Sequence, residues 1–317
     1  MSFWNKLPIP FYALAPMEDV TDTVFRRFVA KLGRPHVFFT EFTNVDGLMS
    51  PGRDRVAHRL KFTDQERPLV AQIWGNDPEN YLKASALLVE MGFRGIDINM
   101  GCPVSKVVRR GSCSGLIDNP TLAREIILAT IEGSGQLPVS VKTRIGVREV
   151  VTEAWCSSLL ELPIAALTVH GRTAKQLSKV PADWDEIGKV VQIRDSLQKK
   201  TLVIGNGDVM SLREADQKVA KHRVDGVMIG RGIFTNPFLF ADRDQPRIDS
   251  LTREQRLELL DEHLTLFEET WEQGARDFSI LKKFFKIYVS GFPGAVEIRS
   301  QLMAARNVAD TRDILGS

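Results

Sequence analysis

The sequence predicts an α/β fold, a (β/α)8 barrel followed by an all-helical C-terminal domain. Short apolar runs alternate with longer amphipathic segments from Phe11 to Gly230, and eight such runs fit in this stretch, as an eight-stranded parallel barrel requires. Beyond Pro246 the strand-like runs stop and helical segments follow. A doubly wound open sheet is the alternative, but no glycine-rich dinucleotide fingerprint follows the first strand.

The elements follow from apolar periodicity and from capping residues. The predicted strands are Phe11–Ala15, Val37–Phe39, Leu69–Ile73, Gly95–Met100, Val139–Val141, Ala166–Val169, Leu202–Ile204 and Gly226–Ile229. The predicted barrel helices are Asp19–Lys31, Pro78–Met91, Pro120–Glu132, Val150–Leu162, Trp184–Leu197 and Ser211–Lys221. Asp77 and Ser211 are the expected N-caps, and Gly92 is an expected stop.

The C-terminal part predicts a second, helical domain. Its expected helices are Leu251–Gln273, Phe278–Val289 and Ala295–Arg306, and the boundary is expected near Asp242–Ile248. We therefore divide the chain into a catalytic barrel, residues 1–242, and a helical domain, residues 243–317.

Composition narrows the class of protein. The 317 residues are 43% hydrophobic and 26% charged, as in ordinary globular proteins, and a net charge of +2 gives no global basic field. Three cysteines without a CxxC pair argue for a reducing compartment and against a structural metal site. We expect a cytoplasmic protein, because the N-terminus has no signal-peptide pattern and no apolar run is long enough to cross a membrane.

One thiol is expected at the carboxyl end of the fourth strand, where ligands of α/β folds bind. The run Gly95–Pro103, GIDINMGCP, places Asn99 and Cys102 there, beside a basic loop with Lys106, Arg109 and Arg110. A thiol near cations can act as an acid or a nucleophile. The alternative is that Cys102 is a small buried apolar residue at a turn.

The other strand ends suggest a phosphate site. Gly205-Asn206-Gly207 and Gly230-Arg231-Gly232 follow the last two strands, and glycines there let backbone N–H groups approach an anion. Lys142, on a buried strand, needs an anionic or acceptor-rich partner, and a structural salt bridge is the alternative. With Gln72 and His170 at neighbouring strand ends, this set suits a flavin mononucleotide (FMN).

Six motifs together resemble the bacterial-type, flavin-dependent tRNA-dihydrouridine synthases. They are APM at Ala15–Met17, DINMGCP at Asp97–Pro103, VKTR at Val141–Arg144, VHGRT at Val169–Thr173, GNGD at Gly205–Asp208 and IGRG at Ile229–Gly232, with KKFFKIYVSGFPGA at Lys282–Ala295 in the tail. The resemblance spans nearly the whole chain.

The resemblance implies an FMN-dependent reduction of the C5–C6 double bond of specific tRNA uridines, with NADPH as reductant. Hydride would pass from flavin N5 to C6, and Cys102 would deliver the proton to C5. The implied cofactor-binding residues are Pro16, Met17, Glu18, Gln72, Lys142, His170, Asn206, Gly207, Asp208, Gly230 and Arg231. The implied substrate-binding residues are Asn99, Arg144, Lys106, Lys282 and Lys286. Lys282 and Lys286 belong to the helical domain, which would therefore bind tRNA. We expect the protein to be a monomer.

Two loops depart from the family pattern, and two other functions stay open. Cys113 stands where small residues are common, and Gln176-Leu177-Ser178 stands where an aromatic residue or glycine is expected. A flavin barrel acting on a free pyrimidine or another small molecule would need neither a helical tail nor the basic strand-end loops. A catalytically inactive RNA-binding barrel would not need Cys102, Lys142 and both glycine loops together.

Overall fold

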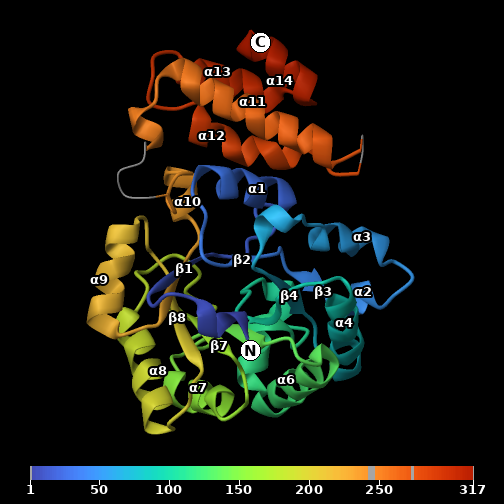
Figure 1. The fold of residues 1–317 in the computed structure, drawn as a ribbon, viewed down its shortest axis with the longest axis vertical. Helices are drawn as coiled ribbons and strands as arrows, with labels where there is room; N and C mark the ends of the chain where they lie inside the picture. Colours follow the sequence, from blue (N-terminus) through green and yellow to red (C-terminus); the bar gives the residue numbers. More distant parts are fainter. Residues whose placement is uncertain (1, 242–246, 273–274, 317) are drawn as a thin grey trace.

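Parallel strands form the walls of the barrel, as predicted (Figure 1). The computed structural model describes residues 2–241, 247–272 and 275–316, and its strands pair in the order β1-β9-β8-β7-β6-β5-β4-β2. The Leu14 N–H donates to the carbonyl of Val37 at 3.2 Å and links β1 to the residue before β2. The strands are β1 Phe11–Leu14, β2 Phe38–Phe39, β3 Thr43–Asn44, β4 Leu69–Trp74, β5 Gly95–Met100, β6 Val139–Arg144, β7 Ala166–His170, β8 Leu202–Asn206 and β9 Gly226–Ile229.

One strand was not expected. β3 lies in the long connection after β2 and pairs in parallel with β4, with Thr43 opposite Ile73. Its two residues are too few to give a period-two pattern, so the sequence reads as a loop.

Helices surround the barrel (Figure 1). They are α1 Thr23–Leu32, α2 Val45–Leu48, α3 Asp54–Ala57, α4 Pro78–Glu90, α5 Ser105–Val108, α6 Pro120–Ser134, α7 Thr152–Leu160, α8 Trp184–Ser196, α9 Leu212–His222 and α10 Gly232–Thr235. Asp77 and Ser211 cap α4 and α9 through their side chains, as predicted. Helix α1 starts at Thr23 instead of Asp19, because Asp19 adopts φ 55° and Asp22 accepts the Phe25 N–H as the N-cap.

Apolar side chains fill the barrel, so its interior is a packed core. Phe11, Phe39, Val70, Ile204 and Met228 are buried in one cluster with Trp4. Trp4 belongs to the short 3-10 helix η1, Phe3–Lys6, so the N-terminal segment joins this inner core. A ligand of the barrel is therefore expected at the carboxyl ends of the strands.

The C-terminal helices pack on α1, above the barrel in Figure 1. The rings of Phe25 and Phe284 lie 4.7 Å apart between centroids, and those of Phe28 and His263 lie 5.0 Å apart. The helices are α11 Arg253–Thr270, α12 Phe285–Tyr288, α13 Ala295–Ala304 and α14 Val308–Leu315. The predicted end of the first helix at Gln273 and the boundary between residues 242 and 243 lie outside the described residues.

The tail is helical as expected, but two of its features were not predicted. Phe278–Phe284 is a 3-10 helix, η6, which aligns the buried residues Leu281 and Phe284, three positions apart, on one side. Helix α14 was missed, because only Val308 and Thr311 of its residues are buried and the apolar period is weak. Asn307, which caps α14 by accepting the Asp310 N–H at 2.7 Å, was the available signal.

Candidate functional site

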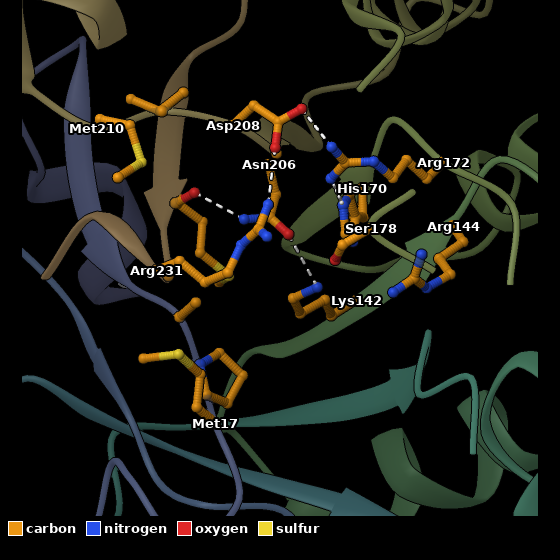
Figure 2. A pocket seen from close by; sticks show the side chains of 16 residues that line it. Met17, Lys142, Arg144, His170, Arg172, Ser178, Asn206, Asp208, Met210 and Arg231 are labelled. Carbon is orange, nitrogen blue, oxygen red and sulfur yellow. Dashed lines mark hydrogen bonds and ion pairs between the residues drawn. The ribbon is translucent and has the colours of Figure 1, made fainter. Parts of the chain in front are cut away.

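A cavity of about 250 Å³ opens at the carboxyl ends of the strands (Figure 2). The register of the strands brings lining residues together: Arg144 of β6 pairs with His170 of β7, and His170 pairs with Asn206 of β8. Ten of the predicted site residues line it: Pro16, Met17, Lys142, Arg144, His170, Asn206, Gly207, Asp208, Gly230 and Arg231. The structure thus brings together most of the predicted cofactor-binding set.

The cavity is rich in positive charge. The Lys142 ammonium donates to Asn206 Oδ1 at 3.2 Å, and burial lowers the pKa of Lys142 to about 8, with Arg144 lowering it further. Burial also lowers the pKa of Arg144 to about 10. An anionic group placed here would relieve the cost of burying these charges.

His170 is a neutral imidazole. Burial lowers the pKa of His170 far below its ordinary value, and the cations Lys142 and Arg144 lower it further. Its Nε2 lies 3.1 Å from Arg172 Nη1, and a guanidinium can only donate, so Nε2 accepts and the proton is on Nδ1. Figure 2 shows the two side chains facing one another at the cavity wall.

Asp208 holds two arginines in place. It accepts from Arg231 Nη2 at 2.8 Å, from the Ala182 N–H at 2.8 Å and from Arg172 Nη2. Although partial burial opposes it, the hydrogen bond from Arg172 keeps the pKa of Asp208 below its ordinary value. Arg172 was not predicted as a site residue; its place two positions after His170, at the end of β7, was the available signal.

The glycines that follow β8 and β9 differ in whether the backbone requires a glycine. Gly207 adopts φ 130°, and a Cβ there would lie 2.6 Å from Ala182 Cβ and 3.2 Å from His170 Cδ2, so only glycine fits. At Gly230 a Cβ would make ordinary contacts, at 3.5 Å from Ala15 and 3.6 Å from Met17. The packing of the described chain therefore does not itself require a glycine at Gly230, which lines the cavity.

Cys102 is half-buried and lies between the end of β5 and α5, and it is not among the residues that line the cavity. A hydrogen bond with the Cys113 thiol lowers the pKa of Cys102 to about 7, although burial raises it. The charge of Arg144 lowers it further, which places the thiol near the cavity's cations. A thiol with this pKa can exchange a proton near neutral pH.

A buried polar chain supports the Cys102 loop. Asn99 Oδ1 accepts the Gly101 and Cys102 N–H groups at 3.0 and 2.9 Å, and its Nδ2 donates to Gln72 Oε1 at 2.9 Å. Gln72 Nε2 then donates to Asp97, which was not predicted as part of the site. Asn99 and Gln72 are buried and do not line the cavity, so their contacts with substrate and flavin stay predictions.

Glu18 lies outside the cavity lining and is paired with Arg59, in the long connection between β3 and β4. Three carboxylates, Glu18, Asp19 and Glu41, have oxygen atoms within 4.8 Å of one another, which is close enough to share a cation. Arg276 pairs with Glu41 at 2.8 Å and with Asp19 at 3.5 Å. Each of the three carboxylates therefore already has a guanidinium partner, since Arg59 pairs with Glu18.

The lysines predicted to bind tRNA lie in different settings. Lys106 and Lys286 are exposed, whereas Lys282 donates to the carbonyl of Met303 at 2.8 Å. Arg144 donates to the carbonyl oxygens of Gly101 at 2.7 Å and Thr173 at 3.2 Å and so ties two loops of the mouth together. None of these contacts tests RNA binding.

Comparison with known proteins decides the family. A family model described as "Dihydrouridine synthase (Dus)" matches residues 13–315. This chain is a dihydrouridine synthase family member. A Staphylococcus aureus protein named "Probable tRNA-dihydrouridine synthase" is 47% identical over 99% of this chain and 94% of its own length. A Bacillus subtilis protein named "Probable tRNA-dihydrouridine synthase 2" is 46% identical over 99% and 95%.

Solved structures confirm the barrel of this dihydrouridine synthase family member. Morphinone reductase has a TM-score of 0.54 at 12% identity, over 77% of this chain and 89% of its own. The old yellow enzyme from Trypanosoma cruzi has a TM-score of 0.51 at 14% identity, over 74% and 89%. No helix in the described part of the chain is long and apolar enough to span a bilayer.

Proposed function

We propose that this protein reduces the C5–C6 double bond of specific uridines in tRNA, with FMN as its cofactor and NADPH as its reductant. The observation that carries the proposal is the cationic cavity, whose Arg144 bonds the carbonyl of Gly101 next to Cys102, a thiol with a pKa of about 7. The membership of the dihydrouridine synthase family supports the same reaction.

The cavity fits a flavin nucleotide. Gly230 and the guanidinium of Arg231 line the cavity together, and a backbone without a side chain beside a cation suits a phosphate. Asn206 and the Lys142 ammonium suit the polar edge of the ring, and Pro16 and Met17 offer contacts from the end of β1. When bound, the flavin would supply the hydride.

The chain's own residues would supply the proton and the positioning. Cys102, in its thiol form, would give its proton to C5 of the uracil. Asn99 would hold the Cys102 loop through its two backbone hydrogen bonds, and Arg144 would hold that loop against the loop after β7. Neutral His170 can accept or donate a hydrogen bond without adding charge.

We propose that residues 243–317 and the exposed lysines Lys106 and Lys286 contact the tRNA, that the protein is a monomer and that it is cytoplasmic. A target uridine must leave its stack to enter the cavity, so a basic surface is needed around the mouth. Such contacts would weaken as salt rises.

The test is a reaction of the purified protein with an unmodified tRNA transcript and NADPH, read as dihydrouridine by mass spectrometry. We expect a yellow protein that forms dihydrouridine, and a loss of roughly a hundred-fold or more in Cys102→Ala, with flavin content and flavin reduction by NADPH retained. Cys156→Ala, at a buried position in α7, is the matched control. Full activity in Cys102→Ala, or reduction of free uridine as fast as tRNA, would contradict the proposal.

A further inference from the structure

A second depression of about 360 Å³ lies beside the cavity, and we call it the rim groove. Its walls are the loops that follow β5, β6 and β7: Pro103 and Arg109 lie in the first, Val147 and Arg148 in the second, Lys175 and Leu177 in the third. Pro103 follows Cys102 directly, so the groove begins where the reacting uridine would end.

The walls of the rim groove are fixed to one another. The N–H groups of Ala174 and Lys175 both donate at 2.9 Å, to the carbonyls of Gly146 and Val147. The Arg144 side chain, at the side of the cavity away from Arg231 in Figure 2, bonds the carbonyls of Gly101 and Thr173. The groove is therefore built by the backbone and by a buried arginine.

The positive charge of the rim groove has no carboxylate partner among the described residues. Arg109, Arg148 and Lys175 are exposed, and within the described chain none of them forms an ion pair. Three other cations around the mouth have carboxylate partners, since Arg59 pairs with Glu18, and Arg172 and Arg231 pair with Asp208. Among the described residues that line the groove, none carries a carboxylate.

Part of the lining of the rim groove is apolar. Pro103, Val147 and Leu177 present apolar surface between the cations, and Leu177 is 42% exposed. A bare inorganic anion would use only the cations. A nucleotide would use both surfaces, because its phosphate is anionic while its ribose and base offer apolar faces.

We infer that the rim groove binds a nucleotide next to the target uridine in the tRNA. Arg109, Arg148 and Lys175 contact its phosphates, and its sugar and base lie on Pro103, Val147 and Leu177. This inference rests on the proposed function. Seating the neighbouring nucleotide beside Cys102 holds the strand while the uridine occupies the cavity.

The experiment compares two triple variants of the full-length, flavin-loaded protein. The groove variant carries Arg109→Gln, Arg148→Gln and Lys175→Gln. The control carries Arg94→Gln, Lys200→Gln and Arg223→Gln, three exposed cations that precede β5, β8 and β9, at the opposite end of the barrel. Binding of a fluorescent unmodified tRNA transcript is measured by anisotropy at several NaCl concentrations.

We expect the groove variant to bind about tenfold or more weakly at low salt, with a log Kd against log salt slope smaller by about 2, since each single-stranded phosphate contact contributes about 0.7. The KM for tRNA should rise while flavin content and NADPH oxidation stay as in the wild type. The control should match the wild type.

An unchanged slope and Kd in the groove variant, with normal binding by the wild type, would overturn the inference alone. So would a weaker affinity for NADPH with unchanged tRNA binding, because the groove would then serve the reductant. A wild-type protein that binds no tRNA would overturn the groove and the proposed function together.

Discussion

The thiol of Cys113 is hydrogen-bonded to the thiol of Cys102, across the loop that follows β5. Cys113 is 1% exposed and has φ 53°, a conformation that costs less for glycine than for any residue with a Cβ. Burial and the neighbouring sulfur keep the pKa of Cys113 well above its ordinary value, so Cys113 keeps its proton and donates. This contact is the largest cause of the lowered pKa of Cys102.

Cys113→Ala should therefore raise the pKa of Cys102 from about 7 toward its ordinary value. The proposed acid is the thiol form, so wild-type activity falls as pH rises through about 7. In the variant the fall should move to a higher pH by one unit or more. The pH profile of kcat/KM for tRNA and the pH dependence of Cys102 alkylation both measure this shift.

Cys113→Ser is the matched control, since its hydroxyl can still donate to the Cys102 sulfur. We expect it to keep a pH profile closer to the wild type than Cys113→Ala does. Identical profiles for the wild type and Cys113→Ala would show that Cys113 does not set the pKa of Cys102.

Asn99→Ala should destabilise the fold and slow uridine reduction. The change leaves the N–H groups of Gly101 and Cys102 without their acceptor and Gln72 without a donor, and an unsatisfied buried group costs about 1–3 kcal/mol. Urea unfolding measures the first effect, and kcat for dihydrouridine formation the second. The control is Asn307→Ala, which removes the cap of α14 and should lower the free energy of unfolding without lowering kcat. A normal kcat in Asn99→Ala would show that Asn99 does not position the Cys102 loop for the reaction.

Lys142→Met should weaken FMN retention and remove its pH dependence. Burial lowers the pKa of Lys142 to about 8, so the ammonium that would attract an anionic ligand is lost as pH rises through about 8. In the wild type the Kd for FMN, measured by flavin fluorescence, should rise above that pH. The variant should bind more weakly at all pH values with a flat profile, and Lys200→Met, at an exposed site, should match the wild type. Equal retention by Lys142→Met and the wild type would contradict the predicted contact.

Strand ends could be read from the sequence, because apolar runs that stop at polar residues fix where a parallel barrel places its ligands. Lys142, His170 and Asn206 were found in this way, and β-sheet register brought them together. Side-chain partners could not be read, since they depend on loop geometry. Glu18 was assigned to the flavin, and its pairing with Arg59 could not be foreseen. Asp97 was missed because a carboxylate within a strand shows its partners, Gln72 and Ser140, only in three dimensions.

Arg276 should be a main anchor of the C-terminal helices on the barrel. Its guanidinium is 6% exposed and contacts Glu41, whose side chain is fully buried, at 2.8 Å. Arg276→Met would leave a buried carboxylate without its cation, which typically costs about 3–5 kcal/mol. Burial raises the pKa of Glu41 to about 7, against the effect of Arg276, so Glu41 is more fully ionised as pH rises above 7. The loss of unfolding free energy, measured by urea titration, should therefore be larger at pH 8 than at pH 6.

Two further variants serve as controls. Glu41→Gln added to Arg276→Met should recover much of the loss, because no charge is then left unpaired. Lys31→Met, which breaks the exposed Lys31–Glu262 pair between the same two parts of the chain, should cost at most about 1 kcal/mol. Equal losses in Lys31→Met and Arg276→Met, or a loss that does not change with pH, would show that burial of the Arg276–Glu41 pair does not govern this contact.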